Sequence, residues 1–252
     1  MKLTFVIPAY NEESCIGRCL QSILEETKND PDDFEIIVVN NGSADQTKKI
    51  ARSFPGVKVI DEPEKGLAKA RQTGYLASNG ELIANVDADN VLPRGWVAKT
   101  LYEFSKNKNL VGLSGPLKYY DLPRLTGVLV NIFYILGFGL YVLNHFIIRR
   151  SGMLQGGNFI IRKSALDEIG GFNTAIKFYG EDTDVAMRLQ KLGLIKFSFL
   201  LPMYSSGRRL KNEGILTMFY KYIANYFWII LFRRPFHKED ATPHPVESKP
   251  PL

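Results

Sequence analysis

The chain has 252 residues, of which 45% are hydrophobic and 23% are charged, and its formal net charge is +6. This composition excludes a disordered or fibrous chain, and the length is enough for one domain with a substantial core. The positive charge does not indicate nucleic-acid binding, because the Lys and Arg residues are scattered except in pairs that flank apolar stretches. These pairs favour anionic lipid head groups instead, and they are Arg149-Arg150, Arg208-Arg209 and Arg233-Arg234.

The cysteines and the first residues bear on the cellular compartment. Cys15 and Cys19 are the only cysteines, and no His lies beside them. A zinc site would lack ligands, so we expect buried free thiols, which suit a reducing cytosol. The apolar segment Leu3–Ile7 ends at Pro8, too early for the core of an export signal. The sequence therefore predicts a first strand and a cytoplasmic protein.

Short β-branched runs alternate with amphipathic stretches through the first half of the chain. This alternation predicts an α/β fold, built from βαβ units on a mainly parallel sheet. Strands are predicted over Leu3–Ile7, Glu35–Val39, Val57–Ile60, Leu82–Val86 and Leu110–Gly115, with helices over Ser14–Glu26, Ala44–Ser53, Gly66–Ser78 and Gly95–Ser105.

The second half departs from this alternation and then returns to it. Leu125–Ile148 is a long apolar run with almost no charge, inside a segment spanning 122–150 that we interpret as an insert. The predicted elements after it are a strand over Gln155–Arg162, a short helix over Ser164–Ile169, and amphipathic helices over Glu181–Leu192 and Ile215–Phe232. The chain is thus predicted to comprise a domain over 1–210, an amphipathic helix within 211–234 and a disordered Pro-rich tail over 235–252.

Acidic residues follow the apolar strand Leu82–Val86 at once, in the sequence Asp87-Ala88-Asp89. In open parallel sheets, ligands bind outside the carboxyl ends of the strands. Two carboxylates there can hold Mg²⁺ or Mn²⁺, which also take oxygens from a diphosphate and neutralise its charge. The alternative is an ordinary surface turn, because such turns are rich in Asp.

A second acidic pair, Glu181-Asp182, opens a predicted helix that also contains Asp184 and Arg188. One interpretation is structural: acidic residues favour a helix N-terminus, and Asp184 pairs with Arg188 at i,i+4. The other is catalytic: if the reaction were a sugar transfer that inverts the configuration of the sugar, it would need a carboxylate that takes the proton from the attacking hydroxyl. Both hypotheses stay open at this point.

Six motifs in order give the chain a resemblance to glycosyltransferase family 2, with its GT-A nucleotide-sugar fold. Together they extend over most of residues 3–200. The motifs are Phe5-Val6-Ile7-Pro8-Ala9-Tyr10-Asn11-Glu12-Glu13, Val38-Val39-Asn40-Asn41-Gly42-Ser43-Ala44-Asp45-Gln46-Thr47, Lys65-Gly66-Leu67-Ala68-Lys69-Ala70-Arg71, Asp87-Ala88-Asp89, Gly156-Gly157-Asn158-Phe159 and Gly180-Glu181-Asp182-Thr183-Asp184.

The resemblance implies an inverting glycosyltransferase that moves a sugar from a UDP- or GDP-sugar to an acceptor hydroxyl, with Mn²⁺ or Mg²⁺. It implies that Asp89 binds the metal and that Asp182 is the catalytic base, with Glu181 beside it. The nucleotide would be bound by Pro8, Ala9, Tyr10, Glu12, Asn41, Arg71 and, at the ribose, Asp87. The acceptor would be bound by Gly156, Gly157 and Asn158.

Two departures from the family pattern affect these expectations. Asn41 stands where the family usually has Asp, which leaves the identity of the base open, although an amide oxygen still accepts a hydrogen bond. The His that often serves as a further metal ligand is absent from the segment Tyr204–Arg209. Arg208 or Arg209 could clamp the diphosphate there. The alternative for this pair is lipid-facing or solvated charge.

The apolar run Leu125–Ile148 is long enough, as a helix, to cross a bilayer. A single crossing would place Asp89 and Asp182 on opposite sides, so we expect a helix that lies on the membrane surface or packs on the core. Ile215–Phe232 carries aromatic residues typical of a membrane interface, and the alternatives for this segment are a buried amphipathic helix and a true membrane span. The sequence thus predicts a peripheral protein on the cytoplasmic face of a membrane, acting on a lipid-linked or cell-surface glycan precursor.

Other functions share parts of this pattern. A nicotinamide oxidoreductase needs GxGxxG after its first strand, and a sugar nucleotidyltransferase usually has a Gly-rich basic loop there, whereas this chain has Pro8–Glu13. A nucleotide-sugar sensor or membrane scaffold without turnover is the remaining alternative. The presence of both Asp89 and Asp182 favours the enzyme over it.

Overall fold

A computed structural model describes residues 1–148, 153–176 and 180–232 of the chain. The arginine pairs Arg149-Arg150 and Arg233-Arg234 lie outside the described residues, as does the predicted disordered tail 235–252.

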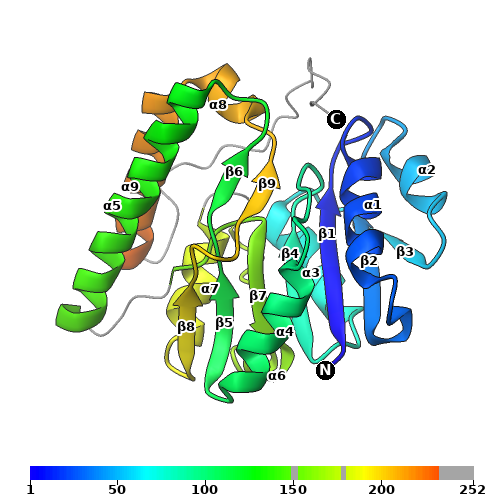
Figure 1. The fold of residues 1–252 in the computed structure, drawn as a ribbon, viewed down its shortest axis with the longest axis horizontal. Coiled ribbons are helices and arrows are strands. Elements are labelled where there is room, and N and C mark those ends of the chain that lie inside the picture. Colours follow the sequence, from blue (N-terminus) through cyan, green and yellow to red (C-terminus); the bar gives the residue numbers. More distant parts are fainter. Residues whose placement is uncertain (149–152, 177–179, 233–252) are drawn as a thin grey trace.

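The described residues contain a seven-stranded sheet in the order β3-β2-β1-β4-β7-β5-β8 (Figure 1). All neighbouring strands are parallel except β7, which runs antiparallel to both β4 and β5. This confirms the predicted mainly parallel sheet. The strands are β1 (Leu3–Ala9), β2 (Phe34–Asn40), β3 (Val57–Asp61), β4 (Leu82–Val86), β5 (Leu110–Ser114), β7 (Asn158–Arg162) and β8 (Leu194–Phe197).

Helices cover both faces of the sheet, so the central strands β1 and β4 are buried along their whole length. On one face, Leu3 and Phe5 of β1 pack with Ile16 of α1 and with the neighbouring helices α2 and α4. On the other face, Val6 of β1 packs against α3. The helices are α1 (Ile16–Thr27), α2 (Thr47–Arg52), α3 (Leu67–Leu76), α4 (Trp96–Lys106), α6 (Lys163–Glu168) and α7 (Glu181–Leu189), with a 3-10 turn at Pro31–Asp33.

The sequence missed four elements that lie around or after the long apolar run. The edge strand β8 completes the main sheet, and the short strands β6 (Leu117–Tyr119) and β9 (Met203–Ser205) form a parallel pair of their own. The helix α8 (Arg208–Glu213) follows β9 directly. Each of these elements has three to six residues, which is too short for a periodic pattern to reveal.

The apolar run forms the helix α5 (Arg124–Ile148), and the last described helix is α9 (Ile215–Phe232). The two lie side by side at the flank of the domain (Figure 1) and contact each other through stacked rings of Phe133 and Phe219, whose centroids are 4.2 Å apart. Tyr134 and Phe138 attach α5 to the sheet through Phe197 of β8.

One side of α5 packs on the domain and the other side faces outward. Among the described residues, no helix combines the length and the apolarity that a bilayer crossing requires. The expected free thiols are confirmed, since Cys15 and Cys19 are both buried and reduced in α1 and the turn before it.

Candidate functional site

The loops that follow β1 and β2 interlock at the carboxyl edge of the sheet. Asn11 takes a left-handed backbone conformation, with φ of 53°, and its side chain accepts a hydrogen bond from the N–H of Ala44. The N–H of Glu12 donates to Thr47 Oγ1 at 2.7 Å. These contacts fix the segment Pro8–Glu12, in which the nucleotide-binding residues were expected, and turn it across the end of β2.

Asn41 supports the neighbouring loop instead of facing open space. Its Nδ2 donates to the carbonyls of Glu62 and Glu64, and its Oδ1 accepts the N–H of Gly66 at 2.9 Å. Only 6% of the residue is exposed. The side chain that was expected to contact the base therefore uses its donors and acceptor to hold residues 62–66 in place.

Tyr10 and Lys65 face each other above this loop. Lys65 Nζ donates to Tyr10 Oη at 2.8 Å and lies 4.6 Å from the centre of its ring. Lys65 is exposed, whereas Tyr10 is half-buried. The aromatic ring thus lies at the edge of the site, where an aromatic face can stack on a planar group such as a nucleobase.

A first charged cluster joins the loop after β1 to the first residue of α8. The guanidinium of Arg208, at the first position of α8, contacts Glu12 Oε1 and lies 3.5 Å from Asp89 Oδ2. All three side chains are about 15% exposed. Glu12 Oε2 is buried and has no hydrogen-bond partner among the described residues.

The electrostatics of this cluster follow from burial. Burial raises the pKa of Asp89 to about 7, because Arg208 offsets the loss of water only in part and the nearby Glu12 and Asp87 oppose ionisation. Burial raises the pKa of Glu12 too. For Arg208, burial lowers the pKa but Asp89 and Glu12 raise it by more, so the guanidinium stays charged. This first cluster thus contains more carboxyl groups than cationic groups, which favours binding of a further cation.

A second charged cluster lies deeper and joins two motifs that are far apart in sequence. Arg71 of α3 is fully buried, donates to Glu181 Oε1 at 2.6 Å and to Asp87 Oδ1 at 3.0 Å, and packs over the ring of Phe159. Burial raises the pKa of Glu181 to about 7, against the opposing effect of Arg71. Arg71 therefore connects the acidic motif after β4 to the one that opens α7. The sequence had instead predicted that Arg71 contacts the nucleotide.

Asp182 is oriented by the backbone on both sides. Its Oδ2 accepts the N–H of Gly156 at 3.0 Å, and its Oδ1 accepts the N–H of Thr183 at 2.7 Å. Burial raises its pKa, although Arg71 and these two N–H groups favour the ionised form. A carboxylate with a fixed orientation and a raised pKa is suited to accept a proton.

The backbone of the two glycines before β7 lies close against the acidic side chains of the site. Gly157 has a φ of 77°, and a Cβ there would lie 2.4 Å from Asp87 Oδ2. A Cβ on Gly156 would lie 3.4 Å from Asp182 Oδ2. The backbone of both residues therefore lies directly between the acidic groups Asp87 and Asp182, where a side chain would intrude.

Asn158 and Arg209 lie elsewhere than expected. Asn158 is fully buried, and its amide donates to the carbonyls of Gly115 and Leu201 and accepts from Trp96 Nε1. It therefore braces β7 from below the site and offers no polar atom to an acceptor in this structure. Arg209 points to Glu213 of its own helix, at 3.3 Å, while its neighbour Arg208 points into the first cluster.

The carboxyl groups of the first cluster fit a divalent cation that takes its remaining ligands from a bound substrate and from water. In the described part of the chain, no group of three or more His, Cys, Asp or Glu side chains could hold a metal. Mg²⁺ and Mn²⁺ are commonly held by one or two carboxylates together with phosphate oxygens and water. Asp89, with the unpartnered Oε2 of Glu12 beside it, matches this smaller requirement.

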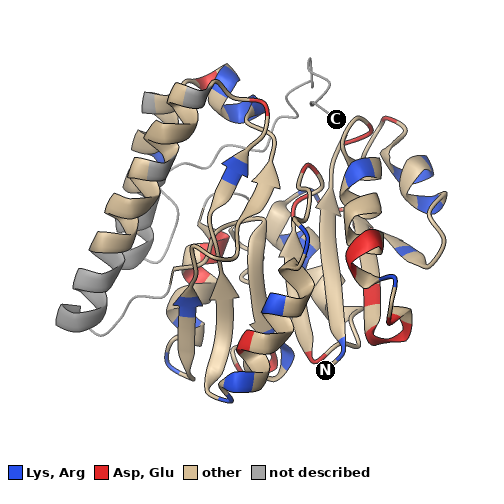
Figure 2. Cartoon of the chain, in the orientation of Figure 1, with Lys and Arg blue, Asp and Glu red and all other residues tan. Residues whose placement is uncertain are grey.

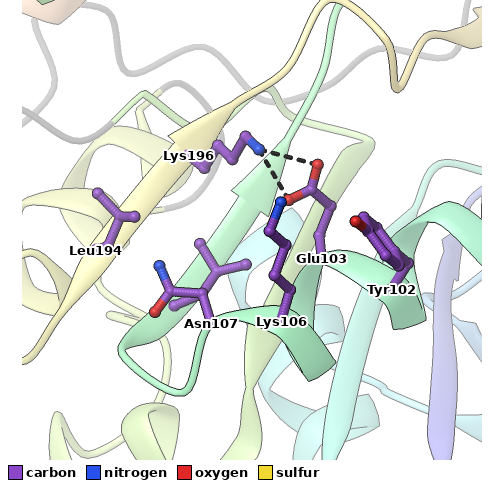
Figure 3. Close-up of a pocket in the computed structure, with 7 residues that line it drawn as sticks. Tyr102, Glu103, Lys106, Asn107, Leu194 and Lys196 are labelled. Carbon is purple, nitrogen blue, oxygen red and sulfur yellow. Dashed lines mark hydrogen bonds and ion pairs between the residues drawn. The ribbon is translucent and has the colours of Figure 1, made fainter.

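A separate groove lies at the opposite, amino edge of the sheet, between α4 and the starts of β5 and β8 (Figure 3). Its volume is about 400 Å³, and an ion pair between Lys196 and Glu103 crosses one side of it. None of the expected site residues lines it. The candidate functional site therefore lies at the carboxyl edge of the sheet, where acidic groups gather at the end of β4 and the start of α7 (Figure 2).

Residues 4–170 match the family model described as glycosyl transferase family 2. The chain belongs to this family. Among curated relatives, it is 31% identical over 147 residues to glycosyltransferase GlyA of Streptococcus pneumoniae, covering 56% of this chain and 20% of that protein. It is 42% identical over 96 residues to dolichyl-phosphate beta-glucosyltransferase ALG5C of Trichomonas vaginalis, covering 34% of this chain and 28% of that protein. The chain thus spans less than a third of either relative.

Solved glycosyltransferase structures share the fold. Mannosyltransferase PcManGT from Pyrobaculum calidifontis, in complex with GDP-Man and Mn²⁺, superposes with a TM-score of 0.68 at 18% identity, covering 91% of this chain and 64% of that one. This confirms the expected GT-A fold of the family 2 chain, with its mainly parallel sheet and flanking helices.

Proposed function

We propose that this family 2 chain transfers a sugar, with inversion, from a nucleoside diphosphate sugar to an acceptor hydroxyl. The observation that carries the proposal is the buried bridge from Asp87 through Arg71 to Glu181. It holds the motif expected to bind the donor beside the motif expected to contain the base, with the bare backbone of Gly156 and Gly157 between them.

In the proposed reaction, the acceptor oxygen forms a bond to the anomeric carbon as the bond from that carbon to the diphosphate breaks. Asp182 takes the hydroxyl proton, and its two backbone hydrogen bonds hold the carboxylate toward the acceptor side. Attack opposite the leaving group inverts the anomeric configuration. Because Gly156 and Gly157 have no side chains, their backbone lies against Asp182 and Asp87, and the acceptor would bind beside this backbone.

Asp89 would hold Mn²⁺ or Mg²⁺, which supplies neutralisation of the negative charge on the leaving diphosphate. The Mn²⁺ in the PcManGT complex supports this assignment. Arg208 lies next to Asp89 and can add charge-assisted hydrogen bonds to the same diphosphate. Tyr10, at the edge of the site, would stack on the base, and Asp87 would bind the ribose. UDP and GDP both remain compatible with this geometry.

The test measures transfer from UDP- and GDP-sugars with Mn²⁺ or Mg²⁺ for three variants. Asp182→Asn is expected to lower turnover by about a hundredfold or more while donor affinity is retained. Asp89→Ala is expected to weaken metal-dependent donor binding instead. The matched control is Asp184→Asn on the same helix, because Asp184 pairs with Arg188 away from Asp182. Normal turnover in both site variants would refute the assignment, and donor binding without turnover in the parent would indicate a sensor.

The apolar face of α5 supports a second part of the proposal, which is that the chain works at a lipid surface. Exposed apolar side chains recur at helical spacing along it, and the described part of α5 carries almost no charge (Figure 2). They are Leu125, Val128, Leu129, Ile132, Ile135 and Leu136. The helix α8 lies near one end of α5 (Figure 1), and its basic residues, which include Arg209 and Lys211, suit anionic head groups. The dolichyl-phosphate relative supports a lipid-linked acceptor.

Vesicle flotation tests this part. Ile132→Gln with Ile135→Gln is expected to reduce binding to vesicles containing anionic lipid, and the control is Leu76→Gln, at a leucine of α3 that is at least as exposed. Equal flotation of all three proteins would refute a role of α5. Transfer to a soluble acceptor is expected to be unchanged in both variants, because these residues lie outside the charged clusters.

A further inference from the structure

Arg208 contacts the carboxylate of Asp89, which is the proposed metal ligand, and that of Glu12 beside it. Its guanidinium lies between Glu12 and Asp89, and its side chain is 15% exposed. We propose that Arg208 is an internal cation that holds these carboxylates while no donor is bound, so that a divalent metal must displace it from Asp89. The inference rests on the proposed function to the extent that Asp89 is the metal ligand.

The charges around Arg208 explain why an internal cation is needed. Glu12, Asp87 and Asp89 act on one another as like charges, and Glu12 and Asp89 are largely removed from water. An uncompensated buried carboxylate is strongly unfavourable, because it has lost its water without gaining a partner. Arg208 is the cation that the structure brings into contact with both Glu12 and Asp89.

The two contacts of Arg208 are unequal. The guanidinium is in close contact with Glu12 Oε1, whereas its distance to Asp89 Oδ2, 3.5 Å, exceeds that of a good charge-assisted hydrogen bond. The contact with Asp89 is therefore the one that yields to a metal ion. Arg208 can then remain on Glu12 and present its other N–H groups to the diphosphate.

The backbone that carries Arg208 is held firmly while its side chain is not. Asp121 accepts hydrogen bonds from Ser206 Oγ and from the N–H of Gly207, and Lys211 lies 3.4 Å from the same carboxylate. The two hydrogen bonds anchor the loop before α8, and the longer ion pair of the exposed Lys211 side chain adds little to them. Displacing the guanidinium from Asp89 then needs only rotation of the Arg208 side chain.

This arrangement couples metal binding to nucleotide binding. When Arg208 holds Asp89, the apparent metal affinity falls in proportion to the fraction of molecules in which Asp89 is available. A diphosphate offers Arg208 alternative anionic partners, which frees Asp89 for the metal. We therefore expect weak binding of the metal alone and much tighter binding together with the nucleotide.

The experiment is a titration with Mn²⁺ in the absence of nucleotide. Binding is measured from the electron paramagnetic resonance signal of the Mn²⁺ that remains free. Arg208→Met is expected to bind Mn²⁺ about tenfold more tightly than the parent chain. The matched control is Lys211→Met, which removes the same charge from the same helix and is expected to bind as the parent does. With Mn²⁺ saturating, UDP or GDP is expected to bind Arg208→Met less tightly. Unchanged or weaker Mn²⁺ binding by Arg208→Met would overturn the proposal.

A second variant guards against misfolding, because Arg208→Met leaves two buried carboxylates without their cation. Arg208→Met combined with Glu12→Gln removes one charge of each sign, and it is expected to bind Mn²⁺ more tightly than Glu12→Gln alone, which lacks the same carboxylate. Adding Asp89→Asn to the combined variant is expected to abolish the gain. Binding no tighter than that of Glu12→Gln, with circular dichroism showing a native fold, would equally overturn the proposal.

The titration involves neither an acceptor nor turnover, so its outcome is separate from that of the transfer assay. Tighter Mn²⁺ binding by Arg208→Met in a chain that transfers no sugar would support the internal cation and refute the proposed reaction. If the parent chain transfers sugar and Arg208→Met binds Mn²⁺ with the same affinity as the parent, the reaction would be supported and the internal cation refuted.

Discussion

Two arginines in this protein each lie between two carboxylates, yet their surroundings differ. Arg71 is fully buried on α3, in the middle of the domain, and bonds Asp87 and Glu181 at 3.0 and 2.6 Å. Arg208 lies on a six-residue helix near the end of the described chain, retains some exposure, and holds Asp89 at 3.5 Å. The same combination of residue types therefore forms a fixed bridge in one place and a replaceable contact in the other.

The difference follows from what each arginine is able to exchange with. Water reaches Arg208, and a diphosphate or a metal ion can take over its partners at the carboxyl edge of the sheet. Arg71 packs over Phe159 and has no exposed surface, so its charge is compensated by carboxylates alone, Asp87 and Glu181 in contact with it and Asp182 nearby. The comparison predicts that removal of Arg71 harms stability, whereas removal of Arg208 mainly changes ligand binding.

The largest expected effect is that of Arg71→Met on the free energy of unfolding. Breaking a buried ion pair by removing one partner leaves the other charge uncompensated, which costs about 3–5 kcal/mol. Urea unfolding measures the loss. Lys69→Met, two residues earlier on the same helix, breaks an exposed pair with Glu64 and is expected to cost less than about 1 kcal/mol. Equal losses in the two variants would remove the distinction between the fixed and the replaceable arginine.

The sequence was sufficient for the sheet and for the place of the acidic motifs. Alternating β-branched and amphipathic segments predicted the strands and helices of the described chain other than β6, β8, β9 and α8, because their periodicity persists over whole strands and helices. Asp87 and Asp89 follow β4, as expected of residues after a buried strand. The resemblance to family 2, which was recognised from the order of six motifs, is confirmed by the family match over residues 4–170.

The partners of the charged residues could not be predicted in this way. Arg71 meets Glu181 across 110 positions and Arg208 meets Glu12 across 196, and no local pattern encodes such contacts. The same limit applies to Asn158. Its motif indicated the acceptor site, but the packing of three distant segments around its amide decides where it lies.

A smaller expected effect concerns the pH dependence contributed by Glu181. Burial raises the pKa of Glu181 from 4.5 to about 7, so between these values the folded state binds this proton more than the unfolded state does. Stability from this group therefore falls as pH rises through that range. Relative to Glu181→Gln, the parent chain is expected to lose up to about 3 kcal/mol between pH 4.5 and pH 7.5.

Urea unfolding of both proteins at several pH values measures this difference. The variant provides its own reference, because carboxylates elsewhere titrate alike in both chains. A constant difference across the range would mean that Arg71 holds Glu181 fully ionised, and the fixed bridge would then be better neutralised than its burial suggests.

The smallest expected effect tests a buried polar group that carries no charge. Asn41 donates to two carbonyls, and Asp at this position, which the family usually has, offers no donor when ionised and would face both oxygens. Asn41→Asp is therefore expected to cost about 1–3 kcal/mol in urea unfolding at neutral pH. The loss should shrink below about pH 4, where the protonated carboxyl donates one hydrogen bond again. A variant as stable as the parent would mean that the loop 62–66 does not depend on Asn41, which would restore this side chain as a candidate contact for the base.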